Sequence, residues 1–482
     1  MRSDFFYLIG GRLVSVIIAL ASIRFATSLL NPDQYGIFAV LATFQAFCGL
    51  FLVNPVGQYI NRHTHEWADE GTLLARLQRF HGYVFLVALI GALTVGAWSL
   101  SQSLSRSECI LRMILIAFMV VAITWNSTWI SLLNMIGARG TSVFWSTVTV
   151  CCSLGLSWGL TTIWHSGLAW FAGQAVGAAI GALGAGNILH RTLAMTKRGS
   201  WPLLTADAIR DYCLPLAIAT GFMWAQLSGY RLLLEHYWGL SALGFVAVGF
   251  GLANQIWGLC ESLVMQYLFP LYYRRISGVS HTDGGKAFSD LLNSIGPAYL
   301  ILVAVTLSSA PALLMLLVAS SYGGVYKFVY LGALVECCRV LANVLGSGAQ
   351  VKRRMNILVL PYALGAAFLT VSLVMAAVAN WSLEQSLVAL PLAAVVMFLA
   401  MGERMRRDLS IEIDYSRWGW AVLIVVIVAP ISWFFPLTPK SYIEAFEILV
   451  GIGALSMICV FALTWKNHAL KRLLTVNLRT GE

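Results

Sequence analysis

The sequence predicts an all-α integral membrane protein with about fourteen transmembrane helices. Of its 482 residues, 59% are hydrophobic and 11% are charged, and the mean hydropathy is +0.79. In a soluble domain, roughly a quarter of the residues are charged. A helix needs about 20 mainly apolar residues to cross a bilayer, so the apolar residues suffice for roughly fourteen spans. Little of the chain is left for a separate soluble domain.

The apolar runs and the polar breaks between them place the spans. The first run is too long for the core of a signal peptide and lacks a convincing cleavage site, so we expect it to be retained as the first span. The longest cytoplasmic connections are expected at about residues 61–80 and 190–212. The spans are expected near residues 5–30, 35–60, 81–104, 110–133, 141–164, 167–189, 213–236, 241–269, 291–318, 322–347, 356–380, 386–402, 418–437 and 443–465.

The distribution of basic residues predicts the orientation. With the N-terminus inside, 23 of the 31 Lys and Arg residues fall on the cytoplasmic side, and only Arg106, Arg112, Lys327 and Lys440 fall on the other. By the positive-inside rule, this asymmetry predicts an even number of spans and cytoplasmic termini. The net charge of +10 then reflects topology and attraction to an anionic leaflet rather than nucleic-acid binding. The cytoplasmic set is Arg2, Arg62, Arg76, Arg79, Arg139, Arg191, Lys197, Arg198, Arg210, Arg274, Arg275, Lys286, Lys352, Arg353, Arg354, Arg404, Arg406, Arg407, Arg417, Lys466, Lys471, Arg472 and Arg479.

An internal similarity predicts the domain organisation. Arg24 precedes Gly36 by 12 residues and Arg231 precedes Gly244 by 13, and Gly-Ile-Phe-Ala-Val in the first copy corresponds to Gly-Phe-Val-Ala-Val in the second. We interpret the copies as the openings of two pseudo-symmetric six-helix lobes, residues 1–200 and 201–410. Residues 411–482 then form two accessory helices and a basic cytoplasmic tail. With an even number of spans in each lobe, the repeat axis lies along the membrane normal. The alternative is a chance similarity between two apolar hairpins.

Other local patterns concern packing and exclude several activities. Gly173, Gly177 and Gly181 form a doubled GxxxG motif in span six, which predicts that another helix of the bundle approaches closely. The nine cysteines lie in or at the ends of apolar segments without CxxC spacing and are interpreted as packing residues. No HExxH, P-loop or GxSxG motif is present, so we expect no metal site, no cofactor and no enzymatic activity.

Four arginines and three glutamates within predicted spans are candidates for a functional or paired role. A charge at the bilayer centre costs about 2.5 to 3.5 kcal/mol, so each needs a partner or a polar cavity. Pairing along one helix, Arg231 with Glu235 or Glu336 with Arg339, would neutralise the charges without any functional role. The seven residues are Arg12, Arg24, Arg231, Arg339, Glu235, Glu261 and Glu336.

The arginines predict an anion-binding cavity. Arg24 lies about 9 Å beyond the midpoint of its span, whereas Arg12, nearer the inner end, can extend its charge to the interface. Because Arg231 occupies the place of Arg24 in the second lobe, we expect the two to share a cationic cavity. A guanidinium group binds two phosphate oxygens at once and stays charged when it is desolvated. The candidate substrate-binding residues are Arg24, Arg231, Arg12 and Arg339, together with Trp224, Trp257 and Asn254, whose rings and amide suit sugars if the tryptophans are not simply packing residues.

The glutamates predict a coupling site. A proton-binding carboxylate must be buried and must not be locked to an arginine. Glu261 has no basic residue within four positions, whereas Glu336 has Arg339 one turn away and Glu235 lies near the outer end of its span. Glu261 is therefore the first candidate for a proton-binding site and Glu336 the second.

The opening stretch carries a resemblance to a known family. After an arginine-bearing first helix, the chain reads Leu29-Leu30-Asn31-Pro32-Asp33-Gln34-Tyr35-Gly36. With the recurrence near Arg231 and the fourteen-span plan, it resembles the Wzx-type flippases for polysaccharides and lipid-linked oligosaccharides, which belong to the multidrug/oligosaccharidyl-lipid/polysaccharide (MOP) exporter superfamily. The second copy departs from the Pro-x-x-Tyr turn.

The resemblance implies two lobes around a central, often cationic cavity. Such a protein moves an undecaprenyl-diphosphate-linked oligosaccharide from the cytoplasmic to the periplasmic leaflet of the bacterial inner membrane by alternating access. The implied partners are this substrate, membrane lipids, H+ or Na+ as a coupling ion, and a polysaccharide polymerase with its chain-length regulator. Nucleic acid is not among them.

Two alternatives remain open. A multidrug exporter of the same superfamily, a cation antiporter, would need acidic residues in its cavity, and here intramembrane arginines outnumber glutamates four to three. A membrane-embedded glycan polymerase or ligase typically needs a sizeable outer loop, and all outer loops are expected to be short.

Overall fold

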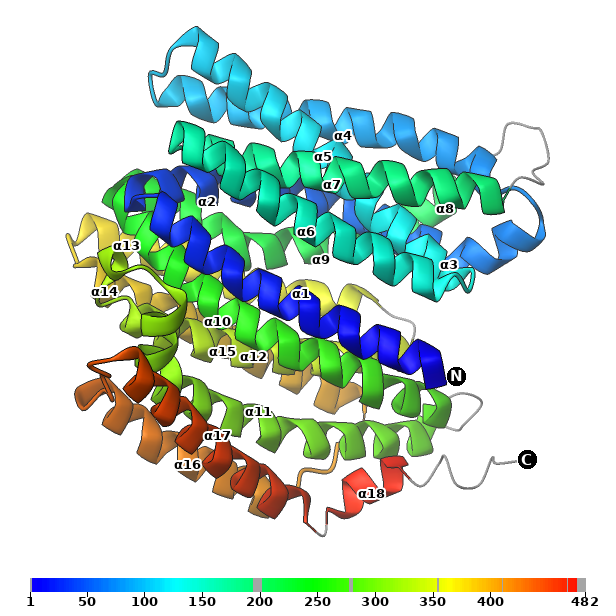
Figure 1. Cartoon of the computed structure of the whole chain (residues 1–482). Coiled ribbons are helices and arrows are strands. Elements are labelled where there is room, and N and C mark those ends of the chain that lie inside the picture. The colour runs from blue at the N-terminus through cyan, green and yellow to red at the C-terminus, as the bar shows by residue number, and fades with distance from the viewer. Residues whose placement is uncertain are drawn as a thin grey trace. The chain divides into compact units, whose positions relative to one another are not determined.

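The structure is a computed structural model that describes residues 2–193, 202–276, 281–352, 355–409, 411–465 and 467–474. Every regular element in these ranges is helical, which confirms the all-α prediction (Figure 1). The chain forms two compact units, Met1–Gly244 and Phe245–Glu482. The predicted lobe boundary at residue 200 lies earlier than this division. The seventh predicted span, near residues 213–236, therefore packs as part of unit 1.

Unit 1 is a bundle in which α7 packs against both α5 and α6, α4 packs against α5, and α1 packs against α6 (Figure 1). The second long helix runs from α2 through the π-helical segment η1 to α3, and we call it the second helix. Two further π-helical segments, η2 and η3, precede and follow α9. The elements are α1 (Arg2–Leu29), α2 (Pro32–Phe47), η1 (Cys48–Val53), α3 (Asn54–Asp69), α4 (Leu73–Ser101), α5 (Arg106–Met135), α6 (Arg139–Trp164), α7 (Gly167–Thr192), α8 (Ala206–Ala208), η2 (Ile209–Cys213), α9 (Leu214–Trp224), η3 (Ala225–Gly229) and the first part of α10 (Tyr230–Ile276).

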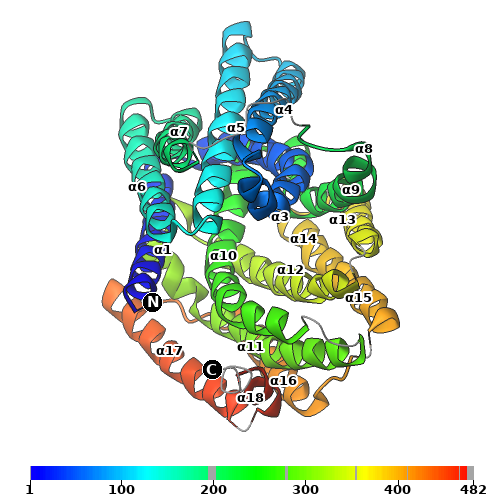
Figure 2. The same cartoon turned by 90° about the vertical axis from the view of Figure 1, so that its right-hand side faces the viewer.

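Unit 2 is organised around α11 and α12. Helix α12 packs against α15, and α11 packs against α12, α16 and α17 (Figure 2). The elements are the rest of α10, then α11 (His281–Leu317), η4 (Ser320–Tyr322), α12 (Tyr326–Lys352), η5 (Met355–Leu358), α13 (Val359–Val378), α14 (Leu383–Leu387), α15 (Ala389–Asp408), α16 (Tyr415–Phe434), α17 (Tyr442–Thr464) and α18 (His468–Leu474).

The described helices accommodate the fourteen predicted spans. Twelve helical stretches are long and apolar enough to cross a membrane. One of them, Ala206–Tyr273, contains Gly239 at φ 86° and ψ 169°, a conformation that glycine adopts readily and that divides the stretch in two. Helix α1, with 28 residues, is also long enough to cross a bilayer, since at 1.5 Å per residue it is about 42 Å long. The chain is therefore a multi-pass integral membrane protein.

The stretch that opens each repeat forms a reciprocal contact in unit 1. Asn31 caps α2 by accepting a hydrogen bond from the backbone N–H of Gln34, and Pro32 occupies the first turn. A Cβ atom on Gly36 would overlap the carbonyl of Leu240, and one on Gly244 would overlap the carbonyl of Pro32. Each glycine thus meets the residue four positions before the other, as expected for a pseudo-two-fold contact. This symmetry supports the interpretation of an internal repeat.

The GxxxG motif packs as predicted. Gly173 and Gly177 of α7 lie directly against the backbone of Ser157 and Ser153 on α6, and Gly181 lies against Thr149. The Ser157 hydroxyl donates to a carbonyl of α7 at 2.9 Å. The stripe of glycines on one helix therefore matches a stripe of small hydroxyl residues on the other, which allows close approach and interhelical hydrogen bonds.

Most of the expected cytoplasmic connection at residues 61–80 is helical. Helix α3 continues to Asp69 and α4 begins at Leu73. The hydropathy falls here, but Ile60, Thr64 and Trp67 are spaced to share a face and are buried. The second connection partly lies outside the described residues, as do six of the cytoplasmic basic residues, Lys197, Arg198, Arg353, Arg354, Lys466 and Arg479.

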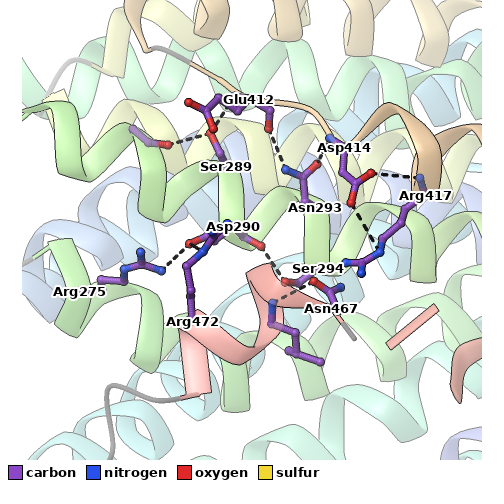
Figure 3. A network of polar contacts seen from close by, with 12 residues as sticks. Arg275, Ser289, Asp290, Asn293, Ser294, Glu412, Asp414, Arg417, Asn467 and Arg472 are labelled. Atoms are coloured by element: carbon purple, nitrogen blue, oxygen red, sulfur yellow. Dashed lines mark hydrogen bonds and ion pairs between the residues drawn. The ribbon is translucent and has the colours of Figure 1, made fainter. Parts of the chain in front are cut away.

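A polar network fastens the C-terminal helices to α11 (Figure 3). The buried carboxylate of Asp290 pairs with Arg275 and with Arg472 of α18, and the hydrogen bonds to Asp290 raise the pKa of Arg472. Asn293 accepts from the backbone N–H of Asp414 at 3.0 Å and donates to the Glu412 carbonyl at 2.7 Å. These contacts fix the segment that leads into α16, one of the two accessory helices.

Candidate functional site

Six polar side chains meet in unit 2 where α10, α12 and α13 pack. The group, which we name the Arg339 cluster, consists of Asn254 and Glu261 from α10, Glu336, Arg339 and Asn343 from α12, and Tyr362 from α13. The members from α10 are seven residues apart, and those from α12 stand at positions i, i+3 and i+7. These spacings place each set on one helix face.

One guanidinium group binds two carboxylates at the centre of the cluster. Arg339 donates from Nη2 to Glu261 at 2.8 Å and from Nε to Glu336 at 2.6 Å. The other carboxylate oxygens accept from the amides of Asn343 and Asn254, each at 2.9 Å. All four carboxylate oxygens therefore have a donor. With every group ionised, the three charged side chains sum to a charge of −1.

This geometry changes the interpretation of the two candidate coupling residues. The Glu336–Arg339 pair predicted along α12 is present. Glu261, which has no cation near it on its own helix, is paired with the same arginine from another helix, so the expectation that it is not locked to an arginine is wrong. Of the two carboxylates, Glu261 is the more accessible, with its side chain 21% exposed against 10% for Glu336.

Two other predicted binding residues of unit 2 have defined partners. Asn254 serves the cluster as a donor to Glu336. Trp257, one turn along α10, is completely buried and its ring lies 5.8 Å from that of Tyr299 on α11. The structure therefore places Trp257 in the packing layer behind the cluster, with no exposed surface.

Arg231, in unit 1, pairs with no carboxylate in the part of the chain that the structure describes. Its Nε atom is buried and has no hydrogen-bond partner among the described residues. The pair with Glu235 considered from the sequence is absent from the described ion pairs, because Glu235 accepts instead from the Trp98 indole at 3.3 Å. Arg231 interacts electrostatically with Tyr35 of α2. A buried guanidinium donor without a partner is costly unless a ligand satisfies it.

The remaining predicted arginines and Trp224 have different surroundings. Arg24 is half-buried near the end of α1. The side chain of Arg12 lies outside the described part of the structure. Trp224 is half-buried, donates to the Thr43 carbonyl at 3.0 Å and packs edge-on against Phe47 at 5.0 Å, so it joins α9 to α2.

The sequence analysis missed a buried cation in unit 1. Arg112, expected on the outer side, is only 6% exposed, and its guanidinium lies over the Trp98 ring at 5.3 Å. Its Nε atom has no hydrogen-bond partner among the described residues. It lies less than two turns inside α5, where hydropathy alone could not distinguish a buried residue from an interfacial one. In unit 2, Asn343 was missed although its spacing of seven from Glu336 signals a shared face.

Comparisons with known proteins agree on the fold. No family model matches the chain, and a search of curated proteins found no match. Among solved structures, the lipid II flippase MurJ in an inward closed conformation matches with a TM-score of 0.59, covering 96% of this chain and 99% of that chain at 8% identity. The chain has the fold of this flippase.

Transporters of the MATE family are also similar. An inward-facing multidrug resistance MATE transporter of the MOP superfamily matches at a TM-score of 0.47 and 11% identity, covering 87% of this chain and 95% of that chain. A MATE in a bent conformation matches at 0.48 and 12% identity, covering 88% and 94%. The matched structures are those of membrane transporters.

Proposed function

We propose that the protein is a flippase of the bacterial inner membrane that moves an undecaprenyl-diphosphate-linked oligosaccharide from the cytoplasmic to the periplasmic leaflet by alternating access. The observation that carries this proposal is the Nε atom of Arg231, which is buried and has no hydrogen-bond partner among the described residues. A diphosphate offers the acceptor oxygens and the negative charge that this group lacks. The match to a lipid II flippase along nearly the whole chain supports it.

The intramembrane charges of unit 1 favour an anionic substrate. Arg231 has a buried Nε atom without a hydrogen-bond partner among the described residues, and the nearby Glu235 accepts from the Trp98 indole. An uncompensated cation inside a membrane marks a substrate pathway by default. The Arg339 cluster of unit 2 has the opposite sign, which suits a coupling cation such as H+ or Na+ rather than the diphosphate.

The same cluster favours one competing function, the export of organic cations. With every group ionised, the cluster has the negative charge that a transporter needs to bind an organic cation. The two functions place the substrate on different residues, because a cationic drug depends on Glu261 and Glu336 whereas a diphosphate depends on Arg24 and Arg231. Variants of each set therefore discriminate between them.

The test is translocation in proteoliposomes of a fluorescent undecaprenyl-diphosphate-linked N-acetylglucosamine, followed by dithionite quenching. Arg231→Ala should abolish translocation, and Arg231→Lys should restore it only in part because an ammonium group cannot form the two-pronged contact. Arg106→Ala, which removes an exposed arginine at the start of α5, is the matched control and should be neutral. Full activity of the Arg24→Ala/Arg231→Ala double variant, or transport of ethidium in place of the lipid, would contradict the proposal.

A further inference from the structure

A polar cavity of about 330 Å³ lies in unit 1 between the second helix and α5. Thirteen residues line it, and eight of them carry an amide or a hydroxyl group. None of the thirteen is charged. We name it the amide cavity, after Gln45, Asn54, Gln58 and Asn61, which line it on the side of the second helix.

The chemistry of the lining selects a neutral ligand with hydroxyl groups. Amides and hydroxyls both donate and accept hydrogen bonds, as the hydroxyls of a sugar ring do. A diphosphate would need cations, and an organic cation would need a carboxylate or an aromatic cage, and the lining offers neither. The volume lies at the lower end of the range for small-molecule sites, roughly 300–1,000 Å³, which suits one small polar group and not a whole lipid-linked oligosaccharide.

The helix backbone beside the cavity includes a π-helical segment and a glycine that leaves space. Gly49, Leu50 and Val53 of the lining belong to the π-helical segment η1, and π-helical segments occur frequently at functional sites. Gly57, one turn further, also lines the cavity, and a Cβ atom there would meet nothing within 4 Å. Because Gly57 has no side chain, this part of the wall leaves room for a ligand.

The cavity occupies the halves of two helices that the topology assigns to the cytoplasmic side. On α5, which begins at the outer Arg106, the lining extends from Ile123 to Ser131, and on the second helix it extends from Gln45 to Asn61. Polar groups at membrane depth are costly unless they line a cavity or find partners. A substrate that enters from the cytoplasmic leaflet would meet these groups first.

We infer that the amide cavity binds one neutral sugar residue of the transported lipid. This inference rests on the proposed function, because it supplies the contact for the glycan while Arg24 and Arg231 contact the diphosphate. The cavity then adds selectivity for the sugar, since a buried hydroxyl or amide left without its partner penalises a substrate that lacks the matching group.

The test uses the full-length protein in lipid nanodiscs with two kinds of probe. Binding of N-acetylglucosamine, galactose and mannose is measured by saturation-transfer-difference NMR, and binding of inorganic pyrophosphate is measured by calorimetry. At least one sugar should bind saturably at millimolar concentration.

Gly57→Phe, which fills the cavity from its open wall, should abolish sugar binding. Thr128→Val, which removes one lining hydroxyl without changing the shape, should weaken it by about tenfold, the equivalent of one lost hydrogen bond. Gly82→Phe, at an exposed glycine of α4 outside the lining, should leave sugar binding unchanged.

The outcomes separate this inference from the proposed function. Unchanged sugar binding in both Gly57→Phe and Thr128→Val would overturn the assignment to this cavity. Absence of saturable binding for all three sugars would overturn the inference itself. Pyrophosphate binding should survive Gly57→Phe and be lost in Arg231→Ala. Sugar binding without pyrophosphate binding would refute the diphosphate site of the proposed function while the sugar site stands.

Discussion

Arg339 is shared between two carboxylates, and this sharing defines what the cluster can do. A single guanidinium group pairs with both of them, so the cluster carries a charge of −1 when every group is ionised. A proton or a cation that enters would remove this excess. Because both carboxylates contact the same arginine, uptake at one of them changes the pairing of the other. Glu261 and Glu336 therefore act as one unit.

Replacing either carboxylate should remove the coupling. Glu261→Gln or Glu336→Gln makes the cluster neutral, so transport into vesicles under an imposed pH gradient should lose its dependence on the gradient in both variants. Glu261, as the more exposed side chain, should show the larger effect. Glu108→Gln, at the exposed start of α5, is the control and should behave as wild type. Unchanged gradient dependence in both cluster variants would exclude the cluster from coupling, and a wild type that ignores the gradient would exclude proton coupling.

At the scale of elements, the contact between α6 and α7 shows how small residues hold a membrane bundle together. Without a hydrophobic driving force between helices in lipid, association depends on close packing and interhelical hydrogen bonds. Gly177 meets the backbone of Ser153, and Ser153 donates to the Gln174 carbonyl at 3.4 Å. The glycine stripe is therefore a stability feature of unit 1 and not a substrate contact.

Gly177→Leu should destabilise the protein because the added side chain overlaps the facing backbone. A loss of about 1–3 kcal/mol is typical of such overpacking. The measurement is the melting temperature of the detergent-solubilised protein, followed by fluorescence-detected size exclusion. The matched control is Gly155→Leu on α6, where a Cβ atom meets nothing within 4 Å. Equal melting temperatures for the two variants would contradict the packing role.

At the scale of the whole molecule, fourteen spans imply that both termini lie on the same side of the membrane. The positive-inside rule predicts that this side is the cytoplasm, since 23 basic residues lie on one side of the predicted topology and four on the other.

Reporter fusions test the orientation. Fusions at Ser105, Trp164 and Asn380 should report the periplasm, and fusions at Arg139 and Lys352 should report the cytoplasm. Ser105 and Trp164 stand at helix ends in the structure, which are suitable positions for insertion. A reversed signal at any position would mean that the order of spans is wrong.

The sequence by itself determined the features that depend on neighbours along the chain. Apolar runs of sufficient length predicted the spans, and the period of four in Gly173, Gly177 and Gly181 predicted a close helix contact. Each of these depends on helix geometry and hydropathy, which act over one or two turns and can be read locally. The same locality explains why the helix at residues 61–69 was not predicted, since a fall in hydropathy does not mark the end of a helix.

Only the tertiary structure decided which buried charges meet. Glu261 finds Arg339 at a separation of 78 residues, and Glu235 finds Trp98 at a separation of 137. The sequence offered Arg231 and Glu235 as an equally plausible pair, because four residues along a helix permit contact without requiring it. The amide cavity could not be predicted from the sequence either, because its polar residues come from two separate helices. Partners across helices are chosen by rotation and depth of packing, and neither is encoded in any single segment.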